Sequence, residues 1–254
     1  SLWRPVMMKH RHWKAWFGVG LVLLSAALYG LHYALFHDSH YIFSYLVLHV
    51  AFVPVEVLLA TLIIHKLLEM HEKQALMNKM NMAIGVFFSE IGDELLAMCQ
   101  RFDMDSELVR GNLIIRNDWS EGRFAELIQR FGSQNLKLDC RRGDLPRLKE
   151  FLLDKRPMLL GLLENPNLLE HERFTDLLWA VFHLTEELAA RKDIHNLIEP
   201  DCVHLAGDVK RAYTHLITGW LSYMMHLKKG YPYLFSLAVR TNPFDPDAKP
   251  EVTQ

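Results

Sequence analysis

The sequence has few of the signals that usually reveal an activity. Its three cysteines, Cys99, Cys140 and Cys202, lie far apart and form no CxxC pair, so the sequence has no zinc-ribbon or thioredoxin-like motif. It contains no catalytic or cofactor motif of known specificity, no internal repeat and no low-complexity block. The net charge of −2 argues against a nucleic-acid partner. What remains to be interpreted is the distribution of apolar and polar segments.

Two long uncharged segments stand near the start of the chain. Residues Ala15 to Phe36 carry no charge and would form a helix of about 33 Å. Residues Tyr41 to Ile64 carry one formal charge, Glu56. Each segment is long enough to cross a bilayer, so the sequence predicts a transmembrane hairpin over residues 15–65, with spans at about 15–36 and 41–64.

Basic residues flank the outer ends of this hairpin, and the tip between the spans has neither lysine nor arginine. The positive-inside rule therefore predicts a multi-pass protein of the inner or plasma membrane, with a basic cytoplasmic N-terminus over residues 1–14 and both termini cytoplasmic. A signal peptide cleaved after Ser25-Ala26-Ala27 is disfavoured because the apolar run continues and a second span follows. On this topology the cysteines are expected to be reduced. The flanking basic residues are Arg4, Lys9, Arg11, Lys14, Lys66, Lys73 and Lys79.

Polar side chains line one face of the second predicted span. His49 lies seven residues before Glu56, and Tyr45 lies one turn before His49. Because a titratable group in hydrocarbon is costly, these residues are expected to face protein or water, and in several copies around an axis they would line an ion pathway. The alternative is a protonated Glu56 that holds the helices in register. Pro54 is expected to kink this span.

The first predicted span has small residues at Ala26, Gly30 and Ala34, spaced four apart. Small residues on one face allow helices to approach closely. The short tip favours a tight antiparallel hairpin, and the shelter that Glu56 needs favours self-association of several chains.

Histidines gather in the outer half of the hairpin. His37 and His40, with Asp38 between them, form a candidate metal site, since imidazole and carboxylate groups suit zinc or copper. His32 and His49 form a candidate pair of axial haem ligands. The alternative is that these histidines only tolerate the polar membrane boundary, so that the protein has neither cofactor.

The rest of the chain predicts a helical cytoplasmic domain over residues 66–241 and a disordered tail over 242–254, which is rich in proline. Helix-start signals are expected at Ser120, at Asp144, at Asn165-Pro166 and at Pro200. The helix after Asp144 is expected to be interrupted at Pro157, the one after Pro166 to run to about Arg191, and the last to end at Gly230. The segment from Tyr231 to Phe235 is expected to dock on the core or a neighbour.

Two polar clusters in this domain could be drawn as metal sites, but the helical pattern argues against this, and they are expected to face solvent or a partner protein. His183, Glu186 and Glu187 lie opposite the apolar face of their helix, and so do the histidines of the last long helix, which contains His204, Asp208, His215 and His226. Trp179, also on a polar side, is a candidate contact residue.

The sequence thus predicts an all-α integral membrane protein with no identified catalytic residue. Three functions are open: a homo-oligomeric ion channel or transport assembly; a membrane-anchored signalling or scaffold protein, or a subunit of a larger complex; and a haem- or metal-dependent redox component. The expected partners are the lipid bilayer, further copies of the chain, and a protein bound to the cytoplasmic helices.

Overall fold

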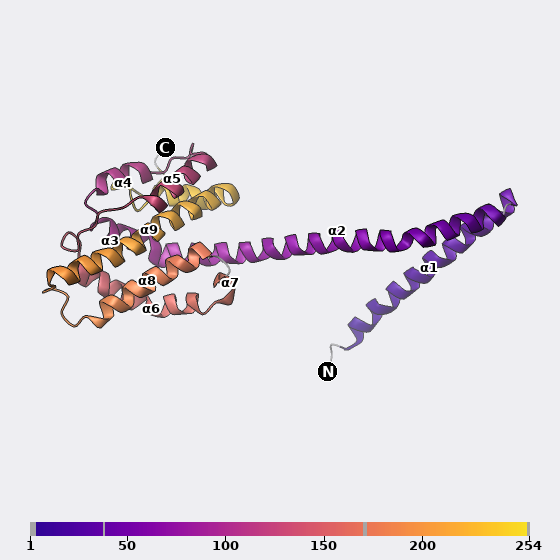
Figure 1. Ribbon diagram of the computed structural model, residues 1–254, viewed down its shortest axis with the longest axis horizontal. Coiled ribbons are helices and arrows are strands. Elements are labelled where there is room, and N and C mark those ends of the chain that lie inside the picture. The colour runs from indigo at the N-terminus through magenta and orange to yellow at the C-terminus, as the bar shows by residue number, and fades with distance from the viewer. Residues whose placement is uncertain (1–3, 38, 170–171, 253–254) are drawn as a thin grey trace. The chain divides into compact units, whose positions relative to one another are not determined.

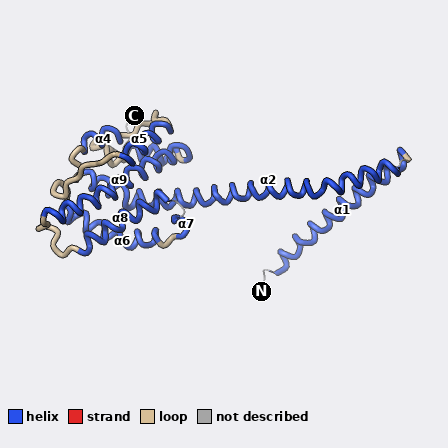
Figure 2. Tube along the Cα trace, viewed as in Figure 1, coloured by secondary structure: helices blue, strands red, loops and turns tan. Residues whose placement is uncertain are grey.

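A computed structural model describes residues 4–37, 39–169 and 172–252. Within these ranges the protein is all helical and has no strand (Figure 2). The β pairing in the described residues consists of one isolated bridge, between Asp103 and Leu138. The predicted all-α class is therefore confirmed. The chain divides into two compact units, Ser1–His71 and Glu72–Gln254.

The first unit contains α1 (Arg4–Phe36) and most of α2 (Ser39–Phe87), which continues into the second unit (Figure 1). α1 ends at Phe36 and is followed by His37, whose φ of 55° is the left-handed conformation that often follows a helix. The His37 amide donates to the carbonyl of Tyr33 at 2.9 Å, which closes the last turn.

Both apolar helices expose their hydrophobic side chains. They are long and apolar enough to cross a membrane, over Trp16–Phe36 and within His40–Gln100, and none of their most apolar windows is buried in the chain. Large side chains such as Leu23, Leu48 and Ile63 are more than half exposed. Water does not accommodate so long an apolar surface, which therefore needs lipid or another protein against it.

The second unit is built from the end of α2 and a series of further helices. These are a π-helical turn, η1 (Phe88–Gly92), followed by α3 (Asp93–Gln100), α4 (Ser106–Leu113), α5 (Glu121–Ser133), α6 (Leu145–Leu163), α7 (Pro166–Leu169), α8 (Glu172–Ala190), α9 (Glu199–Gly230) and α10 (Pro232–Arg240).

The long helix α9 is the centre of this unit. It packs against α3, α5, α8 and α10, while α6 packs on α8 (Figure 1). Its apolar stripe, including Leu205, Val209 and Trp220, is buried as the periodicity predicts. The helices η1 and α3 contribute Phe88 and Leu95, both fully buried.

The predicted helix starts are largely confirmed. Ser120 accepts a hydrogen bond from the Arg123 amide at 3.2 Å, and Asp144 accepts one from the Arg147 amide at 3.0 Å. The predicted interruption at Pro157 is wrong, because α6 continues to Leu163. A proline in a helix forgoes one backbone hydrogen bond, and here burial of leucines on both sides of Pro157 keeps the helix intact.

The helix predicted from Pro166 to about Arg191 is two elements, α7 and α8, on either side of residues 170–171, which lie outside the described range. α9 matches its predicted bounds within one residue. In α10, Phe235 is buried and the Lys228 ammonium lies 5.7 Å from its ring, so the predicted docking on the core is found for Phe235, whereas Tyr233 is 72% exposed.

The C-terminal segment differs from the predicted disordered tail. The Asn242 side chain is buried and donates to the carbonyl of Leu113 at 2.9 Å, and its oxygen accepts from the Phe244 amide at 2.9 Å. Phe244 is also buried, with its ring 5.2 Å from that of Trp220. One aromatic and one amide side chain are enough to order the start of a segment whose composition is otherwise that of a loop.

Candidate functional site

The polar residues of the second apolar helix form a ladder of aromatic contacts. The rings of Tyr41 and Tyr45 lie 5.3 Å apart, and those of Tyr45 and His49 also lie 5.3 Å apart. These contacts join residues four apart, so Tyr45 and His49 share a face as predicted. Glu56 is exposed in the single chain. α2 remains helical through Pro54, and a kink there stays a prediction.

The two apolar helices meet near their tip, where the rings of His32 and Tyr41 stack at 6.2 Å. The predicted close packing along Ala26, Gly30 and Ala34 is not found within the chain. All three are exposed, and a Cβ added at Gly30 would have nothing within 4 Å. The small-residue face is therefore left uncovered by α2.

The predicted metal site at the tip includes Asp38, which lies outside the described residues; His37 and His40 flank it. The ring neighbours of His32 are Phe36 and Tyr41. The haem hypothesis, with His32 and His49 as ligands, stays a prediction.

A cavity of about 1090 Å³ lies in the helical unit, open to solvent. The last turns of α2 supply Met77, Asn81 and Ile84 to its wall, and α5, α8 and α9 supply the rest. Much of the lining is apolar. Small-molecule sites commonly occupy roughly 300–1,000 Å³, so this cavity is large enough for a metabolite or a lipid-like ligand.

Polar groups converge on this cavity from two helices. The amide nitrogen of Asn81 lies 3.3 Å from Nδ1 of His226. Nε2 of His226 is buried and has no hydrogen-bond partner among the described residues. Burial lowers the pKa of His226 and of His215, a second histidine of the wall, so both favour the neutral imidazole. A neutral imidazole with a free ring nitrogen can hydrogen-bond a ligand.

A second cluster bridges α8 and α9. His183 and Glu187 lie one turn apart on α8, and His204 and Asp208 lie one turn apart on α9. Nε2 of His183 is 3.5 Å from Asp208 Oδ1, and Nε2 of His204 is 3.4 Å from Glu187 Oε2. The two histidines are about half exposed, as the helical pattern predicts, but Asp208 is only 3% exposed. The histidine–carboxylate cluster, His183, Glu187, His204 and Asp208, is therefore not simply solvated.

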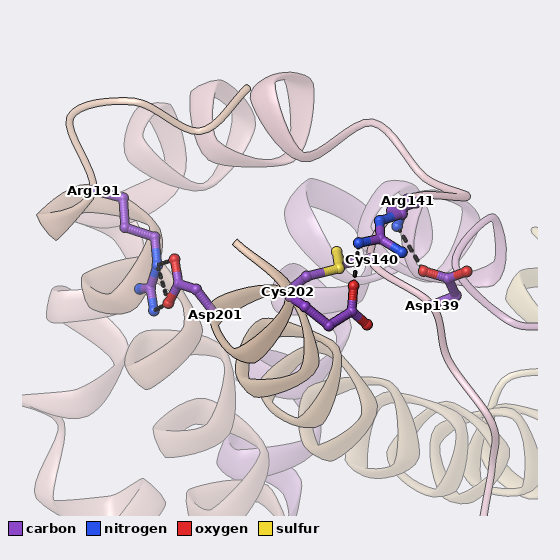
Figure 3. The surroundings of a disulfide bond; sticks show 7 residues. Asp139, Cys140, Arg141, Arg191, Asp201 and Cys202 are labelled. Atoms are coloured by element: carbon purple, nitrogen blue, oxygen red, sulfur yellow. Dashed lines mark hydrogen bonds and ion pairs between the residues drawn. A yellow bond between two sulfur atoms is a disulfide. The ribbon is translucent and has the colours of Figure 1, made fainter. Parts of the chain in front are cut away.

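The expectation that all three cysteines are reduced is wrong for two of them. Cys140 and Cys202 form a disulfide with their Cα atoms 5.6 Å apart, while Cys99 is free and buried (Figure 3). The bridge ties the loop before α6 to the first turn of α9. Near the same end of α9, Arg191 makes a two-pronged contact with Asp201, with its closest N–O distance at 2.6 Å (Figure 3).

Sequence reasoning missed the cavity and the shared position of the four cluster residues. Each helical pattern gives the direction of a side chain about its own axis but not which helix packs beside it. The regular four-residue spacing of His183–Glu187 and His204–Asp208 was the available signal. Of the other predicted polar residues, His215 and His226 line the cavity, and Trp179 is 54% exposed beside Phe182.

The comparisons with known proteins define a family of helical proteins with two domains. Residues 8–68 match the family described as "MJ1433, N-terminal helical domain", and residues 76–240 match "Uncharacterized protein MJ1433, C-terminal helical domain". The chain belongs to this family. The protein named Uncharacterized protein MJ1433, from Methanocaldococcus jannaschii, is 45% identical over 225 residues, which cover 89% of this chain and 90% of the relative.

No solved structure matches the chain. The boundary between the two family domains, at residues 68–76, coincides with the division between the two compact units.

Proposed function

We propose that this protein is a membrane-anchored signalling protein whose helical domain binds a small ligand. The single observation that carries the proposal is the cavity of about 1090 Å³, one wall of which is formed by the end of α2. The same helix contains the longer of the two apolar segments. A ligand that contacts Asn81 therefore touches the element that leads into the anchor.

The anchor in this proposal is the hairpin of α1 and α2 in the inner or plasma membrane. Lysine and arginine flank the hairpin at both outer ends and are missing from its tip, which favours a cytoplasmic N-terminus and a cytoplasmic helical domain. The exposed apolar surface of both helices supports insertion in lipid.

The chemistry of the cavity favours a ligand with an apolar body and a hydrogen-bonding end. Ile84, Ile128 and Phe174 offer apolar wall, while Asn81 and His226 offer polar atoms. Such a division of apolar contact and a few polar groups is typical of sites for amphipathic molecules.

A tryptophan substitution in the cavity wall tests whether the cavity binds a ligand. The environment-sensitive probe 1-anilinonaphthalene-8-sulfonate is titrated into the detergent-solubilised protein and its fluorescence is recorded. Thr218→Trp places a large side chain in the cavity wall, and we expect it to weaken probe binding at least about tenfold.

Thr241→Trp is the matched control. Both threonine hydroxyls donate to the carbonyl four residues earlier, at 3.0 Å for Thr218 and 3.1 Å for Thr241, but Thr241 does not line the cavity. Equal probe binding by the two variants would show that the cavity is not the binding site, and the ligand-binding function would then be abandoned.

The second candidate is an oligomeric ion-conducting assembly, and the face shared by Tyr45 and His49, extended by Glu56, favours it. In this proposal several copies place the three side chains around a cation pathway. Glu56→Gln should lower cation flux into vesicles loaded with a fluorescent ion indicator, while Glu69→Gln, beyond the apolar segment on the same helix, should not. Flux that is the same in all three proteins, or in empty vesicles, would remove this candidate.

A further inference from the structure

The histidine–carboxylate cluster has an arrangement that neither the family nor the proposed ligand cavity explains. Two adjacent helices each present a histidine and a carboxylate with a spacing of four residues. One ligand atom each from His183, Glu187 and Asp208 lie within 4.8 Å of one another, and His204 adjoins the two carboxylates. Helical bundles commonly build metal sites in this way, from carboxylates and histidines on facing helices.

The distances within the cluster form a closed ring. Nε2 of His183 lies 3.8 Å from Glu187 Oε1 and 3.5 Å from Asp208 Oδ1. Nε2 of His204 lies 3.4 Å from Glu187 Oε2 and 3.3 Å from Asp208 Oδ2. Each nitrogen therefore has both carboxylates as neighbours, and each carboxylate has both nitrogens.

These separations suit a shared cation better than hydrogen bonds. A usual N–H···O hydrogen bond spans about 2.7–3.2 Å, which is shorter than all four. In a tetrahedral zinc site with bonds of about 2.0–2.1 Å, neighbouring ligand atoms lie about 3.3–3.4 Å apart. Two of the four distances match that edge and the other two exceed it by a few tenths of an ångström.

Asp208 provides an independent observation. Its side chain is 3% exposed, and its Oδ2 is buried without a hydrogen-bond partner among the described residues. A buried carboxylate oxygen with no donor is destabilising, because it has lost its hydration without a replacement. The nearest group to it in the cluster is the imidazole of His204, and a cation between the two would satisfy both.

Arginines neutralise part of the cluster but not all of it. Arg191 binds Glu187 Oε2 at 2.8 Å and is shared with Asp201, and Arg211 lies 3.3 Å from Asp208 Oδ1. Three carboxylates thus face two guanidinium groups, which leaves one negative charge.

We propose that His183, Glu187, His204 and Asp208 bind one divalent transition-metal ion of the zinc class, which joins α8 to α9. Two imidazoles and two carboxylates are hard-to-borderline donors that suit zinc. The proposal assigns four protein ligands to the ion, His204 joining the three whose ligand atoms are mutually close, and a site with four protein ligands is structural rather than catalytic. The half-exposed imidazoles give the ion an entry path from solvent.

The test uses cobalt as a visible probe for the zinc position. Full-length protein in detergent carries His37→Ala and His40→Ala, so that the histidines beside the tip of the hairpin do not contribute. Stoichiometric Co²⁺ should produce the intense visible absorption of tetrahedral cobalt, and one equivalent of Zn²⁺ should displace it. Zn²⁺ should also raise the melting temperature, because it binds the folded state.

Single substitutions locate the site. His183→Ala and His204→Ala should each weaken Zn²⁺ binding, measured by calorimetry, at least about tenfold. Both side chains are half exposed, so folding is expected to survive even where Asp208→Asn is poorly tolerated. The controls are Glu186→Gln, whose carboxylate binds Arg156 at 2.8 Å, and His215→Ala in the cavity wall.

Binding that is lost in the two histidine variants and kept in both controls supports the proposal. Absence of the cobalt spectrum in the parent protein, or Zn²⁺ affinity unchanged by His183→Ala and His204→Ala, would overturn it. Because the ligand cavity is tested with a separate probe, either result leaves the signalling proposal to its own experiment.

Discussion

Asp93 is the acidic residue whose environment most changes its chemistry. It opens α3 directly after the π-helical turn, and its Oδ1 is buried without a hydrogen-bond partner in the described structure. Burial raises its pKa to about 7, although a hydrogen bond from Trp220 opposes the shift. A carboxyl group that is half protonated near neutral pH makes the stability of the domain depend on pH.

The folded-state pKa of Asp93 lies above its unfolded value of 3.8, so protonation favours the fold. The protonated Asp93 side chain contributes fully to the free energy of unfolding below about pH 4. This contribution declines as the pH rises to about 7 and does not change further above that. Asp93→Asn should remove the decline and raise the free energy of unfolding at pH 8 by up to a few kcal/mol, at about 1.4 kcal/mol per pKa unit. Urea unfolding at pH 4 and pH 8 measures this.

Glu94→Gln is the control, because Glu94 is half exposed and lies 3.7 Å from Arg147. It should leave the pH dependence almost unchanged. A change in the free energy of unfolding between pH 4 and pH 8 that is the same in the wild type and in Asp93→Asn would contradict the assignment to Asp93.

For single residues, the sequence predicts interactions with neighbours along the chain, such as helix caps. It does not predict burial that depends on how distant helices pack. The caps at Ser120 and Asp144 follow from local hydrogen bonds, so they were predictable. The burial of Asp208 was not, because on the pattern of α9 alone its position beside α8 is invisible. The orphaned ring nitrogen of His226 depends on the same kind of information.

The π-helical turn is tightly packed by aromatic side chains. It holds Phe88, which is fully buried, edge-on to Phe87 and stacked on Tyr223 at 5.4 Å. A Cβ added at Gly92 would collide with the Phe88 ring. The ring cannot move away because aromatic neighbours hold it on two sides, so glycine is required at this position.

Gly92→Ala should therefore destabilise the domain by about 1–3 kcal/mol, the usual cost of overpacking. Gly207→Ala in α9 is the opposite case: a Cβ there meets nothing within 4 Å, so alanine should stabilise by about 0.4–1 kcal/mol. Chemical unfolding of the two variants should give shifts of opposite sign. Equal changes in the free energy of unfolding would mean that the helix propensity of alanine decides the result at both positions and that the contact with Phe88 does not matter.

The disulfide joins two elements that are 62 residues apart in sequence, the loop before α6 and the start of α9. Reduction should destabilise the domain by about 2–4 kcal/mol, because it releases a long loop in the unfolded chain. In denaturant without reductant a maleimide should label one thiol per chain, Cys99, and after reduction it should label all three. Labelling of three thiols before reduction would show that the bond is not formed.

Among the elements, the sequence predicts long amphipathic helices well. The ends of α9 and the start of α5 follow from proline, glycine and cap residues. Pro157 failed as a breaker because leucine burial on both sides outweighs one lost hydrogen bond. The expectation of reduced cysteines was wrong for another reason. Which cysteines meet is decided by the packing of distant segments, and their spacing along the chain does not reveal it.

For the whole molecule, the buried core of the described residues lies on one side of the division between the units. Its hydrophobic residues run from Met80 to Phe244, and none of those whose burial is described between residues 16 and 71 belongs to it. A fragment of residues 72–252 should therefore be soluble and helical and should unfold cooperatively. Circular dichroism and size-exclusion chromatography check this, and an aggregated fragment would contradict it.

The full-length chain should behave differently, because the apolar surface of α1 and α2 is exposed. Cell membranes containing it should retain it after alkaline carbonate washing and release it in detergent. Release into the carbonate supernatant would show that the helices do not span the bilayer. The length and composition of these helices were readable from sequence, whereas the uncovered face at Gly30 required the arrangement of α1 against α2.

The position of Asn242 and Phe244 has a consequence for biosynthesis. The carbonyl that Asn242 binds, on Leu113, lies 129 residues earlier in the chain, and Phe244 covers the ring of Trp220. While a ribosome still encloses Asn242 and Phe244, the emerging domain has an uncovered edge at Trp220. Folding of the domain is completed only after Asn242 and Phe244 have left the ribosome, and until then the exposed edge at Trp220 is a surface that a chaperone would recognise.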